Sequence, residues 1–118
     1  MKPEYKFFKN FGYALEGFIE VVKKETSFKL EIFFFIVFTV LALVLSFPVW
    51  AKIFLIASML VPLIVELLNS AVERVVDMVT QEYHPLAKYA KDAAAAAVML
   101  SISFSILVWI AFVLYFFT

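Results

Sequence analysis

Stretches without a charged residue constrain this chain more than any other feature of its sequence. The longest runs from Ala93 to Phe117, and another runs from Ile32 to Phe47 and is closed by Pro48. A third is apolar from Ile53 to Val65 and continues at helical spacing as far as Thr80. A helix needs about 20 apolar residues to cross a hydrocarbon layer of ~30 Å. The sequence therefore predicts an all-α membrane protein with three transmembrane helices.

The composition agrees with a bilayer as the solvent and excludes several classes of function. Of 118 residues, 65% are hydrophobic and 17% are charged, which is more apolar surface than so short a chain can bury in water. Ten basic and ten acidic residues cancel, so nothing indicates a nucleic-acid partner. The absence of cysteine excludes disulfides and thiolate metal sites. One histidine and two glycines exclude multi-histidine metal sites and a glycine-rich phosphate loop.

The N-terminal arm, residues 1–29, combines charge with an apolar stripe. It contains six lysines, and apolar side chains recur at helical spacing at Phe7, Phe11, Leu15, Phe18, Ile19 and Val22. This pattern predicts an amphipathic helix in the headgroup region and not a secretory signal, which would have a short basic head and an unbroken apolar run. We therefore expect one domain over 1–118, made of a surface helix over 1–29 and a three-span bundle over 30–118.

Lysine and arginine counts predict the orientation in the membrane. The N-terminal arm has six, the turn at 48–52 has one, Lys52, and the segment 74–92 has three. The excess of positive charge places the arm and the 74–92 segment in the cytoplasm. Three spans then place Thr118 outside. The two charge-rich segments share one side of the membrane, where a cytosolic substrate could meet both.

The third span carries small residues at every fourth position, namely Ala93, Ala97, Ser101 and Ser105. Small side chains let two helix backbones approach closely, so this stripe favours packing over chemistry. Just upstream, Pro85 suits the first turn of a helix. Asp92 could either cap the third span or orient Lys91.

Four polar residues share one face of the second span. Glu66, Asn69, Glu73 and Asp77 are spaced by three, four and four residues, within about 80° of arc. An ionised carboxylate near mid-bilayer is costly, so Glu66 must face protein, water or a ligand. Helix packing or pairing with lysine is one explanation, but three acids on one stripe repel each other without a cation. Oxygen ligands without histidine or cysteine suit Mg²⁺, which binds one or two carboxylates together with substrate phosphates.

The stretch from Glu66 to Asp77 resembles the signature of a family of membrane enzymes. It reads E-L-L-N-S-A-V-E-R-V-V-D and meets throughout the pattern E-x-x-N-[ST]-A-[IV]-E-x-x-V-D of the small prokaryotic diacylglycerol kinases, which include undecaprenol kinases. Flanking matches are Gly12-Tyr13, Lys24-Glu25, Glu82-Tyr83-His84 and Lys91-Asp92. The resemblance implies a multi-pass homotrimer in the bacterial inner membrane, with active sites shared between neighbouring chains. It also implies ATP as phosphate donor, Mg²⁺ as cofactor and a membrane lipid alcohol as acceptor.

The resemblance further implies roles for individual residues. Glu66 matches the general base that would take the proton of the lipid hydroxyl. Glu25 and Glu73 match the ligands of Mg²⁺, and Asn69 supports the site between the acids. The nucleotide would meet Lys6, Tyr13, Glu25, Glu73, Glu82, Tyr83, His84, Lys91 and Asp92. The lipid would meet Glu66 together with Ser27, Phe28, Lys29 and Glu31.

Several interpretations of the function stay open. Diacylglycerol is the favoured acceptor and undecaprenol the alternative. The acceptor stays open because departures from the family pattern lie on the lipid-facing arm and on the packing helix. Examples are Lys6, where an arginine is common, and the uninterrupted alanines from 93 to 97. A rival from another class is a small proton-coupled transporter subunit that uses Glu66 as an intramembrane proton site. That rival, like a non-catalytic assembly subunit, leaves Glu25 and Lys91 without a role.

Overall fold

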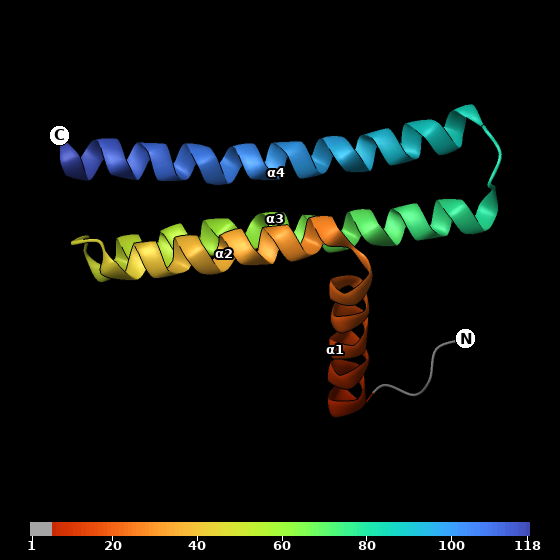
Figure 1. Ribbon diagram of the computed structural model, residues 1–118, viewed down its shortest axis with the longest axis horizontal. Helices are drawn as coiled ribbons and strands as arrows, with labels where there is room; N and C mark the ends of the chain where they lie inside the picture. Colours follow the sequence, from red (N-terminus) through yellow and green to blue (C-terminus); the bar gives the residue numbers. More distant parts are fainter. Residues whose placement is uncertain (1–5) are drawn as a thin grey trace.

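The computed structural model describes residues 6–118, which fold into four helices and contain no strand (Figure 1). These are α1 Phe7–Lys24, α2 Thr26–Val44, α3 Val49–Val79 and α4 Pro85–Phe117. The last three are long and apolar enough to cross a membrane. The predicted fold class, a surface helix followed by three transmembrane helices, is confirmed. Residues 1–5 of the expected surface helix lie outside the described part of the chain.

α1 is the amphipathic helix that the sequence predicts, and it runs across the direction of the other three helices (Figure 1). Its apolar side chains stay largely exposed, Phe11 to 58%, because the helix meets α2 and α3 near its C-terminal end. It ends before Glu25, whose extended conformation turns the chain into α2. The ring of Phe18 packs edge-to-face on the fully buried Phe28, with centroids 5.4 Å apart, and fixes this corner. A helix held across the bundle with its apolar face free suits the headgroup region.

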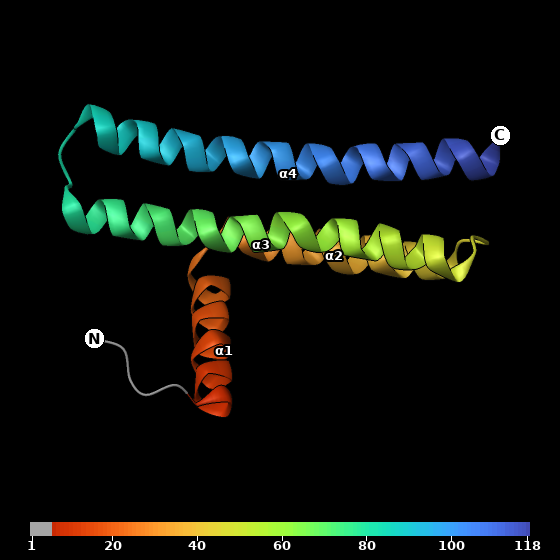
Figure 2. The same cartoon turned by 180° about the vertical axis from the view of Figure 1, so that it is seen from behind.

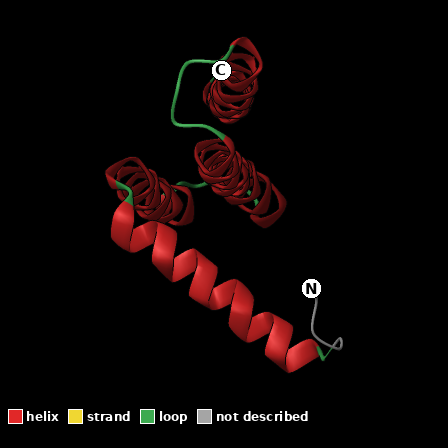
Figure 3. Cartoon of the chain, turned by 90° about the vertical axis from the view of Figure 1, so that its right-hand side faces the viewer, coloured by secondary structure: helices red, strands yellow, loops and turns green. Residues whose placement is uncertain are grey.

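α3 lies between α2 and α4, as Figures 2 and 3 show from behind and from one end. At the end of the bundle far from α1, the helices enclose a core of Ala42, Phe47, Ala51 and Leu55. Aromatic rings of α4 close over this core, and Phe116 stacks on Phe47 with centroids 4.6 Å apart. The bundle is therefore anchored at this end, and polar residues gather at the opposite end beside α1.

Pro62 interrupts the hydrogen-bond ladder of α3 within the span. Proline has no backbone N–H, so the carbonyl of Ser58, four residues earlier, has no partner within the helix. Ser105 of α4 donates its hydroxyl to this carbonyl at 2.5 Å. A freed carbonyl is costly in hydrocarbon, and a serine from a neighbouring helix satisfies it. The predicted packing role of the small-residue stripe thus holds for Ser105 and for Ser101, which is also buried.

A short hairpin at 80–84 joins α3 to α4. His84 caps α4, because its Nδ1 accepts from the backbone N–H of Leu86 at 3.1 Å, and Pro85 opens the first turn. α4 is therefore one continuous helix that begins well before the uncharged run. Asp92 lies inside this helix and pairs with Lys88 at 2.5 Å, so its predicted capping role is wrong.

We expect Ser105→Ala to destabilise the bundle by about 1 kcal/mol, because it leaves the Ser58 carbonyl buried without a donor. The loss should shrink in a Pro62→Ala background, where residue 62 can donate its own N–H to that carbonyl. Unfolding of the four variants of this double-mutant cycle in detergent micelles measures the coupling. Ser103→Ala, on the exposed side of α4, is the matched control. Equal losses in both backgrounds would contradict the link between Pro62 and Ser105.

Candidate active site at the corner of the surface helix

The polar face of α3 lies beside the corner between α1 and α2. Glu66 follows Pro62 by one turn and is only 6% exposed. Asn69 and Glu73 follow on the same face, and Asn69 is also buried. Ser70, which contacts the corner directly, is four residues beyond Glu66, or about 6 Å along the helix axis. Glu66 therefore lies about one turn deeper in the bundle than the corner.

Glu25, the residue between α1 and α2, is held at α3 by two hydrogen bonds. Ser70 Oγ donates to its Oε1 at 2.7 Å, and Arg74 Nη2 donates to its Oε2 at 3.1 Å. Ser70, which holds Glu25, lies one turn after Glu66, and Asn69, three residues after Glu66, donates to Glu73. The fold thus brings together the predicted base and the two predicted metal ligands.

Arg74 also pairs with Glu20, near the end of α1. The hydrogen bond from this guanidinium holds the pKa of the Glu20 carboxyl below its usual range. An acid whose pKa is lowered in the folded state stabilises that state at neutral pH, and the contribution is lost as the pH falls through the lowered value. The Glu20–Arg74 pair therefore helps to hold α1 against α3 at neutral pH and weakens in acid.

Asn69 lies between the acids and has a free acceptor atom. Its Nδ2 donates to Glu73 Oε1 at 3.2 Å, while its Oδ1 is buried without a hydrogen-bond partner. Among residues 6–118, no group of three or more His, Cys, Asp or Glu side chains is arranged to hold a metal by itself. Mg²⁺ commonly binds one or two carboxylates and completes its shell with phosphate oxygens and water. Glu25 and Glu73 are donors that fit such an ion, and the free Asn69 oxygen lies beside them on α3.

A second group of predicted residues lines a pocket at the α3–α4 hairpin. The pocket has a volume of about 280 Å³, and its lining includes Glu82, Tyr83, His84, Lys91 and Asp92. Lys91 pairs there with Asp77 at 2.7 Å, while Asp92 pairs with Lys88, so the predicted orienting of Lys91 by Asp92 is wrong. Ligand pockets usually measure roughly 300–1,000 Å³. This pocket is therefore large enough for part of a nucleotide.

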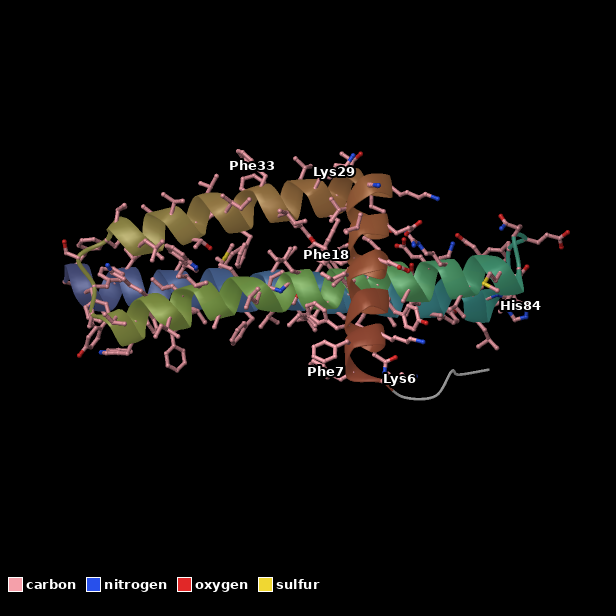
Figure 4. The ribbon with its side chains drawn as sticks, turned by 90° about the horizontal axis from the view of Figure 1, so that it is seen from below. Lys6, Phe7, Phe18, Lys29, Phe33 and His84 are labelled. Carbon is pink, nitrogen blue, oxygen red and sulfur yellow. The ribbon has the colours of Figure 1, made fainter. Side chains whose placement is uncertain are left out.

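The remaining residues predicted for the nucleotide, Lys6 and Tyr13, lie apart from this pocket. Figure 4 shows Lys6 at the free end of α1 and His84 at the hairpin. Tyr13 is exposed, and within the described chain α1 packs against α2 and α3 but not against α4. One chain by itself therefore does not bring these two residues to the hairpin pocket.

The four residues predicted to border the lipid cleft have different surroundings. Ser27 and Lys29 are exposed at the start of α2, whereas Phe28 is fully buried under Phe18 and has no free surface. Glu31 is half-buried, and its Oε2 has no hydrogen-bond partner. It lines a cavity of about 500 Å³ between α2, α3 and α4, whose lining is otherwise almost entirely apolar. Glu31 is therefore the member of this group that faces an apolar cavity.

Sequence reasoning missed three residues that build the corner, Ser70, Arg74 and Glu20. Ser70 and Arg74 follow Glu66 at four-residue spacing, so the sequence does indicate that they share its side of the helix. Their partners are distant in the chain: Ser70 and Glu25 are 45 residues apart, and Arg74 and Glu20 are 54 residues apart. Helical periodicity carries no information about such contacts.

Together these features define an integral-membrane, all-α protein with a buried carboxylate cluster at one end of its bundle and a polar pocket beside it. Sequence comparison identifies the family. The profile of the prokaryotic diacylglycerol kinases matches residues 12–113, which is most of the chain. The chain therefore belongs to the prokaryotic diacylglycerol kinase family.

Individual relatives agree with this assignment. The diacylglycerol kinase of Pseudomonas aeruginosa is 38% identical over 98 residues, which cover 83% of this chain and 80% of that protein. The diacylglycerol kinase of Escherichia coli K12 is 36% identical over 98 residues, with the same coverage of 83% and 80%. The undecaprenol kinase of Bacillus subtilis is 38% identical over 95 residues, which cover 79% and 76%.

Family membership confirms the predicted lipid kinase, which uses ATP and acts on a lipid in the membrane. Family membership rejects the two alternative functions, a proton-coupled transporter subunit and a non-catalytic assembly subunit. The relatives named for diacylglycerol and for undecaprenol reach the same identity of 38%, so overall similarity does not distinguish the two acceptors. The family match begins at residue 12, so it includes Tyr13 and begins after Lys6.

Proposed function

We propose that this kinase transfers the γ-phosphate of ATP to the hydroxyl of diacylglycerol, with Glu66 as general base and with Mg²⁺ bound by Glu25 and Glu73. The observation that carries the proposal is the buried Glu66, one turn before the Ser70 that holds Glu25 and on the same helix face as Glu73. It lies about one turn below the corner where α1 would rest in the headgroups. A lipid hydroxyl at the membrane surface reaches the same depth.

Glu66 supplies the proton acceptor in this proposal. A primary hydroxyl must lose its proton as its oxygen attacks phosphorus, and a carboxylate within hydrogen-bond reach can take that proton. The unpartnered Oδ1 of Asn69 lies on the same helix face and can accept from the hydroxyl while it is being positioned. The chain's contribution is mainly this positioning, together with the balance of charge around the phosphates.

The nucleotide would be held by two groups of residues. Glu25 and Glu73 would bind Mg²⁺, which when bound neutralises charge on the phosphates. Lys91, which pairs with Asp77, offers a flexible ammonium to the phosphates. The base and ribose would meet Glu82, Tyr83, His84 and Asp92, and, from α1, Lys6 and Tyr13.

The lipid would enter laterally beside α2. Ser27 and Lys29 are exposed at the level of the corner, and Phe28 supports this border from inside by fixing the corner. Glu31 opens onto the apolar cavity, which has room for the first part of an acyl chain. Diacylglycerol is the favoured acceptor, and undecaprenol is the second candidate because a relative of equal identity carries that name.

A homotrimer with shared sites would complete the nucleotide site. The separation of Lys6 and Tyr13 from the hairpin pocket supports it, because a neighbouring chain can bring its α1 to this chain's α4. In the proposed topology the arm and the 74–92 segment are cytoplasmic and Thr118 is outside the bacterial inner membrane. ATP would then reach the hairpin pocket from the cytosol. The whole chain, 1–118, would act as one domain.

A two-lipid kinase assay tests the proposed function. The purified protein in mixed micelles, given labelled ATP and Mg²⁺, should convert diacylglycerol to phosphatidic acid at a kcat/KM at least about tenfold above that for undecaprenol. Lipid products are separated and counted, and micelles without acceptor give the background. The opposite ratio would identify the undecaprenol kinase instead, and no lipid product from either acceptor would reject the proposal.

Glu66→Gln should lower lipid phosphorylation at least about 100-fold, because an amide of the same shape cannot take the proton of the hydroxyl. Nucleotide binding should change less than about twofold, since the substitution leaves Glu25, Glu73 and Lys91 in place. Single-turnover kinetics and binding of a fluorescent nucleotide measure the two effects. Glu16→Gln, on the exposed side of α1, is the matched control. Full activity in the Glu66 variant would remove it as the base.

Glu73→Ala should raise the Mg²⁺ concentration for half-maximal activity at least about tenfold, because the ion loses one of its two protein ligands. Titration of Mg²⁺ at saturating ATP measures the shift, with Glu16→Ala as the control for loss of an acidic side chain. If the titration of the Glu73 variant matches that of the unmodified chain, Glu73 is left with a packing role alone.

A further inference from the structure

Arg74 joins the surface helix to the bundle, yet the proposed reaction gives it no role. One of its nitrogens donates to Glu20 of α1, and the other donates to Oε2 of Glu25 at 3.1 Å. Ser70, one turn earlier on α3, donates to the second oxygen of Glu25 at 2.7 Å. Arg74 falls on a position of the family signature that accepts any residue, so the signature itself assigns it no role.

Arg74 supplies positive charge to a crowded group of acids. The negative charges of Glu25 and Glu73 both act on the buried Glu66, and like charges repel. A guanidinium can pair with two carboxylates at once because its donors form a rigid fork. Without Arg74, this repulsion would push Glu25, and the end of α1 with it, away from α3.

Because Arg74 has two acceptors, a metal ion could bind Glu25 and the guanidinium of Arg74 would still be paired with Glu20. An ion that takes Oε2 of Glu25 removes one partner of Arg74, but Glu20 remains. Ser70 keeps the other oxygen of Glu25 in place. Lys24 also pairs with Glu20, at 3.4 Å, but this ion pair lies within α1 and does not link α1 to α3.

We propose that Arg74 is a positioning residue of this kinase, which fixes Glu25 beside α3 before Mg²⁺ binds by anchoring the end of α1 through Glu20. The proposal rests on the proposed role of Glu25 as a metal ligand. Loss of Arg74 makes Mg²⁺ harder to bind, because binding must then also order the corner. Turnover at saturating Mg²⁺ is unchanged, because Arg74 acts through the carboxylates of Glu20 and Glu25 and not on the substrates.

The first test is a Mg²⁺ titration of lipid phosphorylation by the full chain in mixed micelles. Arg74→Ala should raise the half-maximal Mg²⁺ concentration at least about threefold and keep kcat within about twofold. Glu20→Gln should raise it similarly, Arg74→Lys less, and Lys24→Ala not at all, since Lys24 pairs with Glu20 of its own helix. An unchanged midpoint in Arg74→Ala overturns the proposal. A lowered midpoint also overturns it, because it would make Arg74 a competitor of the ion.

The second test measures the anchoring without using catalysis. The chain has no cysteine, so spin labels can be placed through Gly17→Cys on α1 and Met78→Cys on α3. A Cβ at Gly17 would meet nothing within 4 Å, and Met78 is 86% exposed. With labelled chains diluted in an excess of unlabelled chain and without Mg²⁺ and ATP, double electron–electron resonance should give a narrow distance distribution in the parent and in Lys24→Ala, and a broad one in Arg74→Ala. A narrow distribution in Arg74→Ala overturns the proposal.

The two tests separate this proposal from the proposed function. If Glu25→Ala leaves the Mg²⁺ midpoint unchanged, the metal role of Glu25 fails, and the positioning of a metal ligand by Arg74 fails with it. The spin-label distances then still decide whether Arg74 anchors α1. If Glu25→Ala shifts the midpoint and Arg74→Ala does not, the metal role stands and the proposal for Arg74 is overturned.

Discussion

The site depends on the contact between the α1–α2 corner and α3. The acids of α3 are placed by the bundle, but Glu25 reaches them because Ser70 and Arg74 donate to its two oxygens. The same corner is fixed from the apolar side by Phe18 and Phe28. One contact therefore sets two things at once: the height of the surface helix on the bundle, and the position of a carboxylate beside Glu66. If α1 rests in the headgroups as proposed, this contact also fixes the depth of the acidic site below the membrane surface.

A polar site at the edge of the hydrocarbon layer requires that the rest of the bundle has no unsatisfied polar groups within the membrane. Pro62 lies one turn deeper than Glu66 and frees the Ser58 carbonyl, which Ser105 satisfies from α4. This bond and the aromatic core at the far end hold α3 against α4. Pro62 and Glu66 belong to the same continuous helix. The packing of the apolar part of α3 therefore fixes the direction in which its acids point.

The bilayer is the reason that the helices could be predicted from the sequence. An uncharged run in lipid must satisfy its own backbone hydrogen bonds, so it forms a helix. Lysines among regularly spaced apolar residues indicate an amphipathic helix. All four helices predicted in this way are present. The ends of the helices were less predictable. α4 begins at Pro85, eight residues before the uncharged run, and the ion pair between Lys88 and Asp92 lies in this additional N-terminal part. Spacing alone predicted that Glu66 and Glu73 share a face. The partners of Arg74 could not be predicted, because they depend on how α1 crosses α3.

Lys91 is the side chain that links the two parts of the candidate site. It pairs with Asp77 at the hairpin pocket, and Asp77 lies only one turn after Glu73 on α3. Phosphates held near Glu73 would therefore be within reach of Lys91, and they could take the place of Asp77 as its partner. The hairpin pocket, at about 280 Å³, is too small to enclose a whole nucleotide. In the proposed trimer, the exposed Tyr13 of a neighbouring α1 would supply part of the remaining wall.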